Sequence, residues 1–450
     1  MAPIPHTLIP FLQSQSQNTL TRLYQLPSSC LSIYRLLGPL ERQLVMSLLW
    51  LESSVPPSVM AGWVIREGKQ LYEGALSTLS RLHIISSPVG KLALNSTFKT
   101  SFRQAITGSG TSGSFGVPAE PDDKHPPLAV EGLDGYALER WETILHYMVS
   151  SGTGQSPTKP STGVLYLLQR SGLMISHRGS PLQITSAGFQ FLLHSPHDQL
   201  WDLLLQYLHM AEERKMDLVE VLSFLFMLST MQLGREYSTE NLGVSQKAML
   251  EDLRDYGLIW QRRPTSKRFS PTRLATTLTS SSPPLPTAAG TSTGPQDGFI
   301  VLETNYRIYA YTDNPLKTAV LNLFVSLKYR FPNLVVGSIT RDSVKKALNN
   351  GITADQIISY LISHAHPQMR KNNPLLPVTV QDQIRLWELE RNRLKSAEGY
   401  LYTSFTSQAD YELVLNYAKE LDVVLWENKA KRCFFGSLHL LPITPALKDV

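Results

Sequence analysis

The sequence predicts a mainly α protein with small β-sheets: tandem winged-helix domains, then an α/β domain, then a small C-terminal β-α-β-β domain. Three observations favour this fold class. Residues 107–127 and 279–297 are rich in Gly, Ser, Thr and Pro, a composition that cannot form a packed core. A helix–strand–hairpin–strand pattern repeats before the second of these segments. After it, β-branched and aromatic residues become frequent.

The two segments set the predicted domain boundaries. A chain of 450 residues fits roughly three domains of ~150 residues each. The predicted parts are a helical and winged-helix domain (1–106), a flexible linker (107–127), a second winged-helix domain (128–210), a third (211–278), a second linker (279–297), an α/β domain (298–373) and a C-terminal domain with its leading helix (378–450).

Composition excludes several classes of protein. A hydrophobic fraction of 42% is too high for a chain disordered throughout. The net charge of +5 is mild and does not by itself imply a nucleic-acid partner. Charged residues make up only 18%, which indicates either extensive burial against partners or large, well-packed domains.

Cysteine usage and hydropathy indicate the compartment. Cys30 and Cys433 lie at opposite ends of the chain, so neither a disulfide framework nor a Cys-based zinc site is expected. We therefore expect the protein to reside in a reducing compartment. The most apolar run, Val221–Leu233, is shorter than the ~20 residues that span a bilayer. No basic residue precedes Arg22, so we expect no secretory signal and no membrane segment.

The repeat carries the winged-helix prediction. Leu168–Ile175 and Leu253–Trp260 each read as a helix end, a C′ glycine (Gly172, Gly257) and a short strand. A polar turn and a second strand follow each copy. A weaker third copy runs through Leu79–Ile85, with His83 in the position of the glycine. Spacings of 89 and 85 residues between these positions are typical of tandem domains.

Three helices precede the repeated strands. Leu133–Met148 places Leu138, Trp141, Leu145 and Met148 on one stripe. Leu200–Met210 is similarly apolar. Met216–Leu228 is apolar nearly all round, which predicts a buried central helix.

The α/β domain begins with a predicted strand pair over 299–311 that turns near Thr304-Asn305. A helix over Pro315–Tyr329 and a strand over Leu334–Ser338 are expected next, followed by two short helices with N-caps Thr340 and Thr353 that are joined through Asn350-Gly351. A charged helix over Gln381–Ser396 then leads to the C-terminal elements. These are a strand (Tyr400–Phe405), a helix (Asp410–Leu421) and two further strands (Val423–Glu427 and Arg432–Gly436).

Motifs for catalysis and metal binding are absent or lack their structural context. The sequence has no phosphate-binding Gly-rich loop and no HExxH. One G-x-S-x-G match, around Ser292, lies in the second linker without the strand and helix that a nucleophile elbow needs. The pairs His364/His366 and His194/His197 have no Cys or carboxylate at ligand spacing. We therefore predict no enzyme, no catalytic residue, no metal and no cofactor.

A basic cluster supports an alternative function. Arg262, Arg263, Lys267 and Arg268 lie on the predicted third wing, where Lys and Arg can contact the phosphates of duplex DNA. The other interpretation is a solvated hairpin tip. Gln246–Tyr256, the predicted recognition helix, is acidic, and this favours protein interaction over sequence reading.

Two β-rich regions are candidate protein interfaces. Parity along 299–311 places Glu303, Arg307, Tyr309 and Tyr311 on the less apolar face. Tyr and Arg are common interface anchors, but the same aromatic residues also suit a core. The small C-terminal sheet has open edges, which either pair with another chain or are covered by this one.

Long runs of residues resemble the subunit 4 family of the general transcription and repair factor TFIIH. They cover nearly the whole chain apart from the linkers. The runs are Ile184–Leu192, Met216–Phe226, Pro271–Ala275, Gly298–Thr312, Tyr329–Asn333 and Asp382–Arg391. The strongly basic C-terminal tail of some relatives has no counterpart before Val450.

The resemblance implies a nuclear, non-catalytic scaffold for RNA polymerase II initiation and nucleotide excision repair. The part matching 298–371 is then a clutch domain that binds the XPB helicase and supports its ATPase. Its candidate helicase-binding residues are Glu303, Tyr306, Arg307, Tyr309 and Tyr311. The C-terminal strand would pair with the smallest core subunit, with Tyr400, Leu401, Tyr402 and Phe405 as candidates. The N-terminal winged helices would contact other core subunits.

Overall fold

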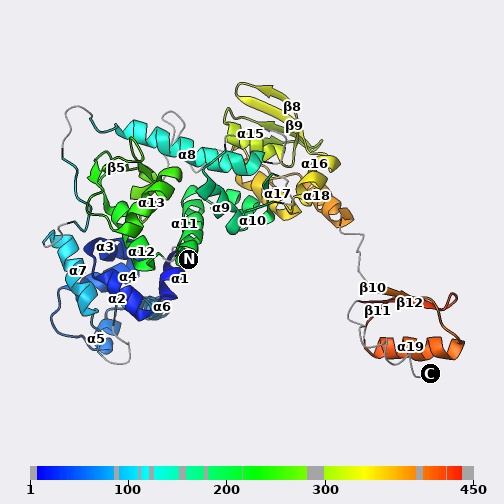
Figure 1. Ribbon diagram of the computed structural model, residues 1–450, viewed down its shortest axis with the longest axis horizontal. Helices are drawn as coiled ribbons and strands as arrows, with labels where there is room; N and C mark the ends of the chain where they lie inside the picture. Colours follow the sequence, from blue (N-terminus) through cyan, green and yellow to red (C-terminus); the bar gives the residue numbers. More distant parts are fainter. Residues whose placement is uncertain are drawn as a thin grey trace. The chain divides into compact units, whose positions relative to one another are not determined.

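The computed structural model describes residues 8–85, 91–109, 113–120, 126–151, 159–176, 181–214, 216–280, 298–391, 399–421 and 423–437. The chain forms two compact units, Met1–Ile384 and Arg385–Val450 (Figure 1). Helices dominate, and the strands form small antiparallel sheets, which confirms the mainly α prediction. Among the described helices, none is both long and apolar enough to cross a bilayer.

Short helices build the N-terminal part. They are α1 (Leu8–Gln13), α2 (Gln17–Tyr24), α3 (Pro27–Leu36), α4 (Pro39–Leu49), α5 (Pro57–Gly62), α6 (Lys69–Arg81) and α7 (Ser96–Thr107). Prolines occupy the first turn of α3, α4 and α5, where the missing N–H has no intrahelical partner to lose. Helix α3 packs against α2 and α7, and Tyr24, Phe98 and Phe102 form an aromatic cluster there.

The middle part alternates helices with very short strands. It contains α8 (Val130–Ser150), α9 (Thr162–Arg170), β1 (Met174–Ile175), β2 (Gln183–Ile184), α10 (Ser186–Leu193), α11 (Pro196–Glu213), α12 (Leu218–Thr230), β3 (Tyr237–Ser238), α13 (Val244–Asp255), β4 (Ile259–Trp260), β5 (Arg268–Pro271) and α14 (Arg273–Thr276). Strands β1 and β2 form one sheet, and β3, β5 and β4 form another in that order.

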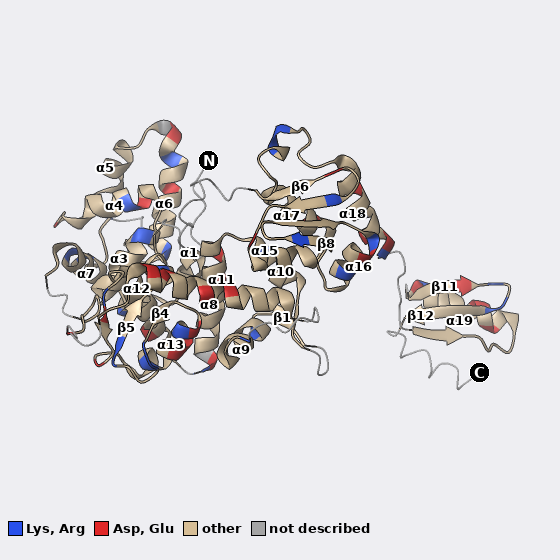
Figure 2. Ribbon diagram, turned by 90° about the horizontal axis from the view of Figure 1, so that it is seen from above, with Lys and Arg blue, Asp and Glu red and all other residues tan. Residues whose placement is uncertain are grey.

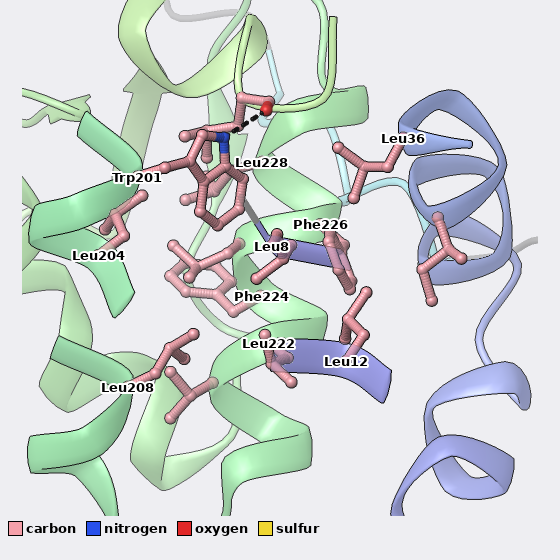
Figure 3. Close-up of a cluster of buried hydrophobic side chains, with 14 of the residues drawn as sticks. Leu8, Leu12, Leu36, Trp201, Leu204, Leu208, Leu222, Phe224, Phe226 and Leu228 are labelled. Carbon is pink, nitrogen blue, oxygen red and sulfur yellow. Dashed lines mark hydrogen bonds between the residues drawn. The ribbon is translucent and has the colours of Figure 1, made fainter. Parts of the chain in front are cut away.

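Helix α12 is the centre of the largest core, as its all-round apolar sequence predicts. Every residue from Val221 to Ser229 is buried. The helix packs against α2 and α3 on one side and against α11, α13 and α14 on the other. Figure 3 shows its Leu222, Phe224, Phe226 and Leu228 meeting side chains from α1, α3 and α11. One continuous core therefore runs from the first helix to Leu278.

Buried polar contacts fix the position of α12. Ser32 of α3 hydrogen-bonds to Ser229 at 3.0 Å, and Thr279 donates to the same Ser229 oxygen at 3.1 Å. Trp201 of α11 donates its indole N–H to the Leu278 carbonyl at 2.8 Å (Figure 3). A buried polar group is costly unless it is paired, so these bonds select one arrangement of the apolar helices.

The predicted repeat appears three times at the level of hydrogen bonds. Gly172, Gly257 and His83 all have positive φ, at 71°, 78° and 52°. In two copies, the residue after the left-handed one donates its backbone N–H to a carbonyl at the end of the helix. Leu258 donates to the Leu253 carbonyl, and Ile84 donates to the Leu79 carbonyl. This is the Schellman pattern, in which a left-handed residue lets the chain leave the helix.

The segment after each repeated strand also matches. Thr185, Thr272 and Asn95 each donate a backbone N–H to the carbonyl of the residue directly after the left-handed one, namely Leu173, Leu258 and Ile84 respectively. Each is the N-cap of the next helix. The three copies share one local geometry despite their weak sequence similarity.

Part of the first predicted linker is ordered. Val117 accepts a hydrogen bond from Ser238 at 2.8 Å, and Ala119 donates to Glu236 at 2.9 Å. Residues 117–119 thus run beside β3, because tertiary pairing supplies backbone bonds that their composition does not predict. Residues 281–297 of the second predicted linker, with Ser292, lie outside the described residues.

The α/β part holds a four-stranded antiparallel sheet in the order β6-β7-β9-β8. Its elements are β6 (Ile300–Leu302), β7 (Arg307–Ala310), α15 (Pro315–Asn322), β8 (Ser326–Phe331), β9 (Leu334–Ser338), α16 (Arg341–Asn349) and α17 (Ala354–Ser363). Thr340 and Thr353 cap α16 and α17, as predicted, and each forms a capping box.

The predicted helix Pro315–Tyr329 is wrong in its second half. Helix α15 ends at Asn322, and Ser326–Phe331 is the edge strand β8. Phe331 pairs with Leu334 across the two-residue turn Pro332-Asn333. That turn joins β8 to β9 in a hairpin, and strand pairing then overrides the helical pattern of the preceding residues.

The sheet is attached firmly to the middle part. Helix α15 packs along α8, and Asn314 donates to the Glu142 carboxylate at 3.1 Å. The ring of Phe189, from α10, lies 6.3 Å from Phe324 and 6.2 Å from Tyr360. Apolar and polar contacts therefore hold the sheet against α8 and α10.

The second unit is small. Helix α18 (Val378–Arg391) leads into it, and residues 392–396 of the predicted helix lie outside the described residues. Helix α19 (Gln408–Glu420) covers one face of a sheet of β10 (Gly399–Tyr402), β12 (Cys433–Ser437) and β11 (Val424–Asn428). The predicted β-α-β-β order is confirmed.

The central role of α12 can be tested with Phe226→Ala. Phe226 is fully buried, so truncation should lower the free energy of unfolding by ~3–5 kcal/mol. Tyr166→Ala, at an exposed aromatic position of α9, is the control and should change it by less than ~0.5 kcal/mol. Guanidinium unfolding followed by circular dichroism would measure both variants. Equal effects would contradict the central role of α12.

Candidate protein-interaction surfaces

The four-stranded sheet has one buried face and one open face. Ile300, Ile308, Ala310 and Val335 point into the core. The alternate positions form cross-strand rows on the other face. One row runs Val301–Tyr309–Val336–Tyr329 across all four strands, and another runs Arg307–Ser338–Ser326. None of these open-face side chains is fully buried.

The two edges of this sheet differ. On the β6 side, Ile300 bonds to the backbone of His364 at 3.0 Å and of His366 at 2.8 Å, so the chain itself covers that edge. On the other side lies β8, whose residues are almost all exposed. Tyr329 is 64% exposed and Phe331 is 52% exposed. An exposed edge with large aromatic side chains is suited to a partner.

A tight turn positions Glu303 and Arg307 at the end of this face. Glu303 N–H donates to the Arg307 carbonyl at 3.0 Å, which closes the β6–β7 hairpin. Asn305 bridges them: its amide donates to the Glu303 carboxylate at 3.0 Å, and its side-chain oxygen accepts from Arg307 N–H at 2.9 Å. Tyr306 has φ 66°, a left-handed conformation that the turn imposes.

Arg307 is the electrostatic centre of the open face. A hydrogen bond and electrostatic interaction with Tyr309 raise the pKa of Arg307, with smaller contributions from Glu303 and Tyr329. The guanidinium is charged at neutral pH, as arginine is throughout proteins, and Arg307 is exposed. The structure brings together three predicted residues, Glu303, Arg307 and Tyr309, with one that the prediction missed, Tyr329.

The remaining predicted residues of this site lie at its margins. Tyr311 is exposed, with its ring 5.8 Å from that of His366. Tyr306 is half-buried in the turn, and its carbonyl accepts a bond from Ile339. Tyr329 and Phe331 were missed because their segment reads as a helix; the Pro332-Asn333 turn is the signal that identifies them.

The C-terminal residues divide into two groups. Tyr402 stacks on Phe434 at 4.9 Å, and Phe405 lies 5.2 Å from Tyr411 in an edge-on arrangement. Both pack against the small core beneath α19. Tyr400 and Leu401 are instead exposed on β10, an edge strand. The structure therefore places two predicted residues at the edge and two in support of it.

The open face of the C-terminal sheet carries an apolar row, of which only Leu401 was predicted. Leu401 and Trp426 both pair with Phe435 of the central strand, so the three share one face, away from α19. Leu401 and Trp426 are exposed. Period-two alternation about Phe435 is the signal that could have found Trp426.

Internal ion pairs engage half of the predicted basic wing. Lys267 pairs with Glu240 at 3.0 Å, and Arg268 pairs with Glu236 at 3.4 Å. Arg262 and Arg263 are exposed in the turn between β4 and β5. Figure 2 shows Lys and Arg mixed with Asp and Glu around β4, β5 and α13, a distribution unlike the uniform positive face that binds duplex DNA.

His364, His194 and Cys30 each interact with other groups of the chain. His364 caps α17, stacks on Tyr360 at 4.2 Å, and has its pKa lowered by burial. His194 pairs with Asp202 at 2.8 Å. Burial raises the pKa of the Cys30 thiol. Within the described residues, no cluster of three or more His, Cys, Asp or Glu could hold a metal ion.

Known proteins resemble this chain over nearly its full length. Residues 10–367 match the family model described as transcription factor Tfb2, and residues 382–440 match the Tfb2 (p52) C-terminal domain. "General transcription and DNA repair factor IIH subunit TFB2" of Yarrowia lipolytica is 47% identical, covering 95% of this chain and 93% of the relative. The same-named protein of Saccharomyces cerevisiae is 39% identical, covering 96% and 95%. "General transcription factor IIH subunit 4" of Dictyostelium discoideum is 34% identical, covering 93% of each.

The division between edge and core residues can be tested by two truncations. Phe405→Ala should remove aromatic packing from the C-terminal core and increase amide exchange in α19 by ~10-fold or more. Leu401→Ala, at an exposed position, should leave that exchange within ~2-fold. Hydrogen–deuterium exchange of the full chain would measure both. Equal exchange in the two variants would place Phe405 outside the core.

Proposed function

The chain belongs to the Tfb2 family of transcription factor subunits, and on that premise we propose that it is a non-catalytic scaffold of TFIIH. In this proposal it anchors the XPB helicase and supports its ATPase during RNA polymerase II initiation and nucleotide excision repair. Its site of action is the nucleus. The names of the relatives, which describe general transcription and DNA repair factor IIH subunits, support this role.

One observation carries the helicase-binding part of the proposal: the open face and free edge of the four-stranded sheet. Glu303 and Arg307 are exposed there with opposite charges, beside Tyr309 and the exposed Tyr329. Arg and Tyr at the centre of a patch are typical interface anchors, and opposite charges specify the register of a partner. This surface would bind the N-terminal part of the helicase.

The mode of action is positional. The sheet that would bind the helicase is fixed to α8 and α10 through Asn314, Phe324 and Tyr360, and those helices join the continuous core. A rigid tether removes orientational freedom from the bound motor before it acts, so less entropy is lost in reaching the productive arrangement.

A second partner would bind the C-terminal unit. Strand β10 is an edge strand with exposed Tyr400 and Leu401, and unpaired edge groups accept a strand from another chain. The buried cluster there is small and comprises Tyr411, Val414, Leu415, Ala418 and Phe434 among the described residues. So small a core gains stability from an added partner. We assign this edge to the smallest TFIIH core subunit.

The N-terminal helices offer a surface for other core subunits. Trp63, Ile65 and Leu71 are exposed around a groove lined by α4, α5 and α6. Exposed apolar side chains that gather at a groove mark protein contacts more often than isolated ones do. This supports the expectation that the N-terminal part joins the complex.

The winged-helix assignment is part of the proposal. Helix α12, strand β3, helix α13 and the hairpin β4–β5 follow one another, and the sheet order is β3-β5-β4. This order of helix, strand, helix and hairpin suits a winged helix. The shared core suggests that the copies at His83, Gly172 and Gly257 work as one rigid body.

Charge reversal tests the helicase surface. Glu303→Lys combined with Arg307→Glu should reduce co-purification of XPB by ~10-fold or more, because like charges would then face each other across the interface. Lys345→Glu, at an exposed position of α16, is the control and should leave recovery unchanged. Quantitative immunoblotting after affinity purification would measure it. Unchanged recovery and ATPase stimulation in the double variant would refute the assignment.

A lysine on the edge strand tests the second surface. Leu401→Lys should reduce recovery of the small subunit several-fold, since a charged side chain opposes edge-to-edge pairing. XPB binding through the four-stranded sheet should persist in this variant. Mass spectrometry of the purified complex would report both partners. Normal recovery of the small subunit would exclude β10 as its docking strand.

A further inference from the structure

Helix α19 carries a second apolar row, displaced around the helix from its buried stripe. Tyr411, Val414, Leu415 and Ala418 face the sheet and are buried. Leu413, Tyr417 and Leu421, which follows the helix end, are 73%, 48% and 45% exposed. Their spacing of four residues places them in one row along the helix. Within the described part of the unit, these three side chains remain exposed.

Acidic side chains flank the row, and one of them opposes helix stability. Asp410 and Glu412 lie in the first turns, where the helix dipole favours negative charge. Glu420 lies in the last turn, where the dipole disfavours it, and it is exposed. Lys419, the basic residue of α19, is engaged with Glu427 at 2.5 Å. The outer face of α19 is therefore apolar with an acidic border.

From this combination we propose that the outer face of α19 docks a basic amphipathic helix of a partner protein. Apolar side chains of that helix pack between Leu413, Tyr417 and Leu421, as ridges pack into grooves between two helices. Lysines or arginines beside them meet Glu412 and Glu420. The site is separate from the β10 edge, because its side chains are exposed on α19 and not on a strand.

Two other occupants fit the surface less well. A second copy of this chain, docked through the same face, would bring two acidic borders together, and like charges across an interface are unfavourable. The chain's own segment 438–450 contains Pro442 and Pro445, which interrupt a helix, and its one Lys is followed directly by Asp449.

A synthetic peptide pair tests the proposal on the full chain. The basic probe is an 18-residue, fluorescein-labelled helix with leucines at four- and three-residue spacing and lysines elsewhere; the acidic probe has glutamate in place of lysine. By fluorescence anisotropy, the basic probe should bind at least tenfold more tightly. Leu413→Glu should weaken it tenfold or more. Glu412→Lys with Glu420→Lys should reverse the preference.

The control variant makes the same Leu→Glu substitution at an exposed leucine on a different helix. Leu389→Glu alters another exposed leucine, on α18, and should leave binding of the basic probe unchanged. Leu401→Lys should also leave it unchanged while losing the small subunit, so failure of one surface is distinguishable from failure of the other.

Three outcomes overturn the proposal. The first is equal binding of the two probes, or no loss with Leu413→Glu. The second is concentration-dependent dimerisation in sedimentation that Leu413→Glu abolishes, which would assign the face to a second copy. The third is tighter probe binding after truncation at Ser437, which would assign it to the chain's own tail.

Discussion

The burial of α12 on all sides is the constraint on which the largest unit depends. A helix without a polar face cannot reach solvent, so it must be enclosed by others. It is enclosed by α2 and α3 from the start of the chain and by α11, α13 and α14 from the middle. Segments about 200 residues apart thus share one core, and the buried Ser32–Ser229–Thr279 contacts allow one arrangement of them.

A series of contacts connects this core to the proposed helicase surface. Helix α8 is tied to α14 by Asp134 and Arg273, whose guanidinium donates at 3.0 and 2.7 Å. The same α8 packs along α15, which leads directly into the edge strand β8. The open face around Arg307 is thereby held relative to a core that lies elsewhere in the unit. Such a connection suits a scaffold, whose chemistry is the placement of other proteins.

The C-terminal unit differs from the large unit in having a small core and many exposed apolar side chains for its size. Its core is a handful of side chains, and apolar residues remain exposed on its edge, its open sheet face and its helix. Apolar side chains such as Trp63 and Tyr329 are exposed in the large unit too, but that unit also has a far larger buried core. The low fraction of charged residues is consistent with the large packed core of the first unit.

The sequence alone determined those features that depend on residues close together in the chain: turns, helix caps and the two faces of a strand. Steric rules for left-handed residues marked the turns at Gly172 and Gly257, capping residues marked α16 and α17, and parity separated Arg307 and Tyr309 from Ile308 and Ala310. Tertiary structure decided the rest, because pairing depends on what lies opposite. The hairpin partner β9 made 326–331 a strand and exposed Tyr329, and β3 ordered residues 117–119. Tyr402 and Phe405 pack against the small core of the C-terminal unit. Lys267 and Arg268 form ion pairs with acidic residues of the same chain.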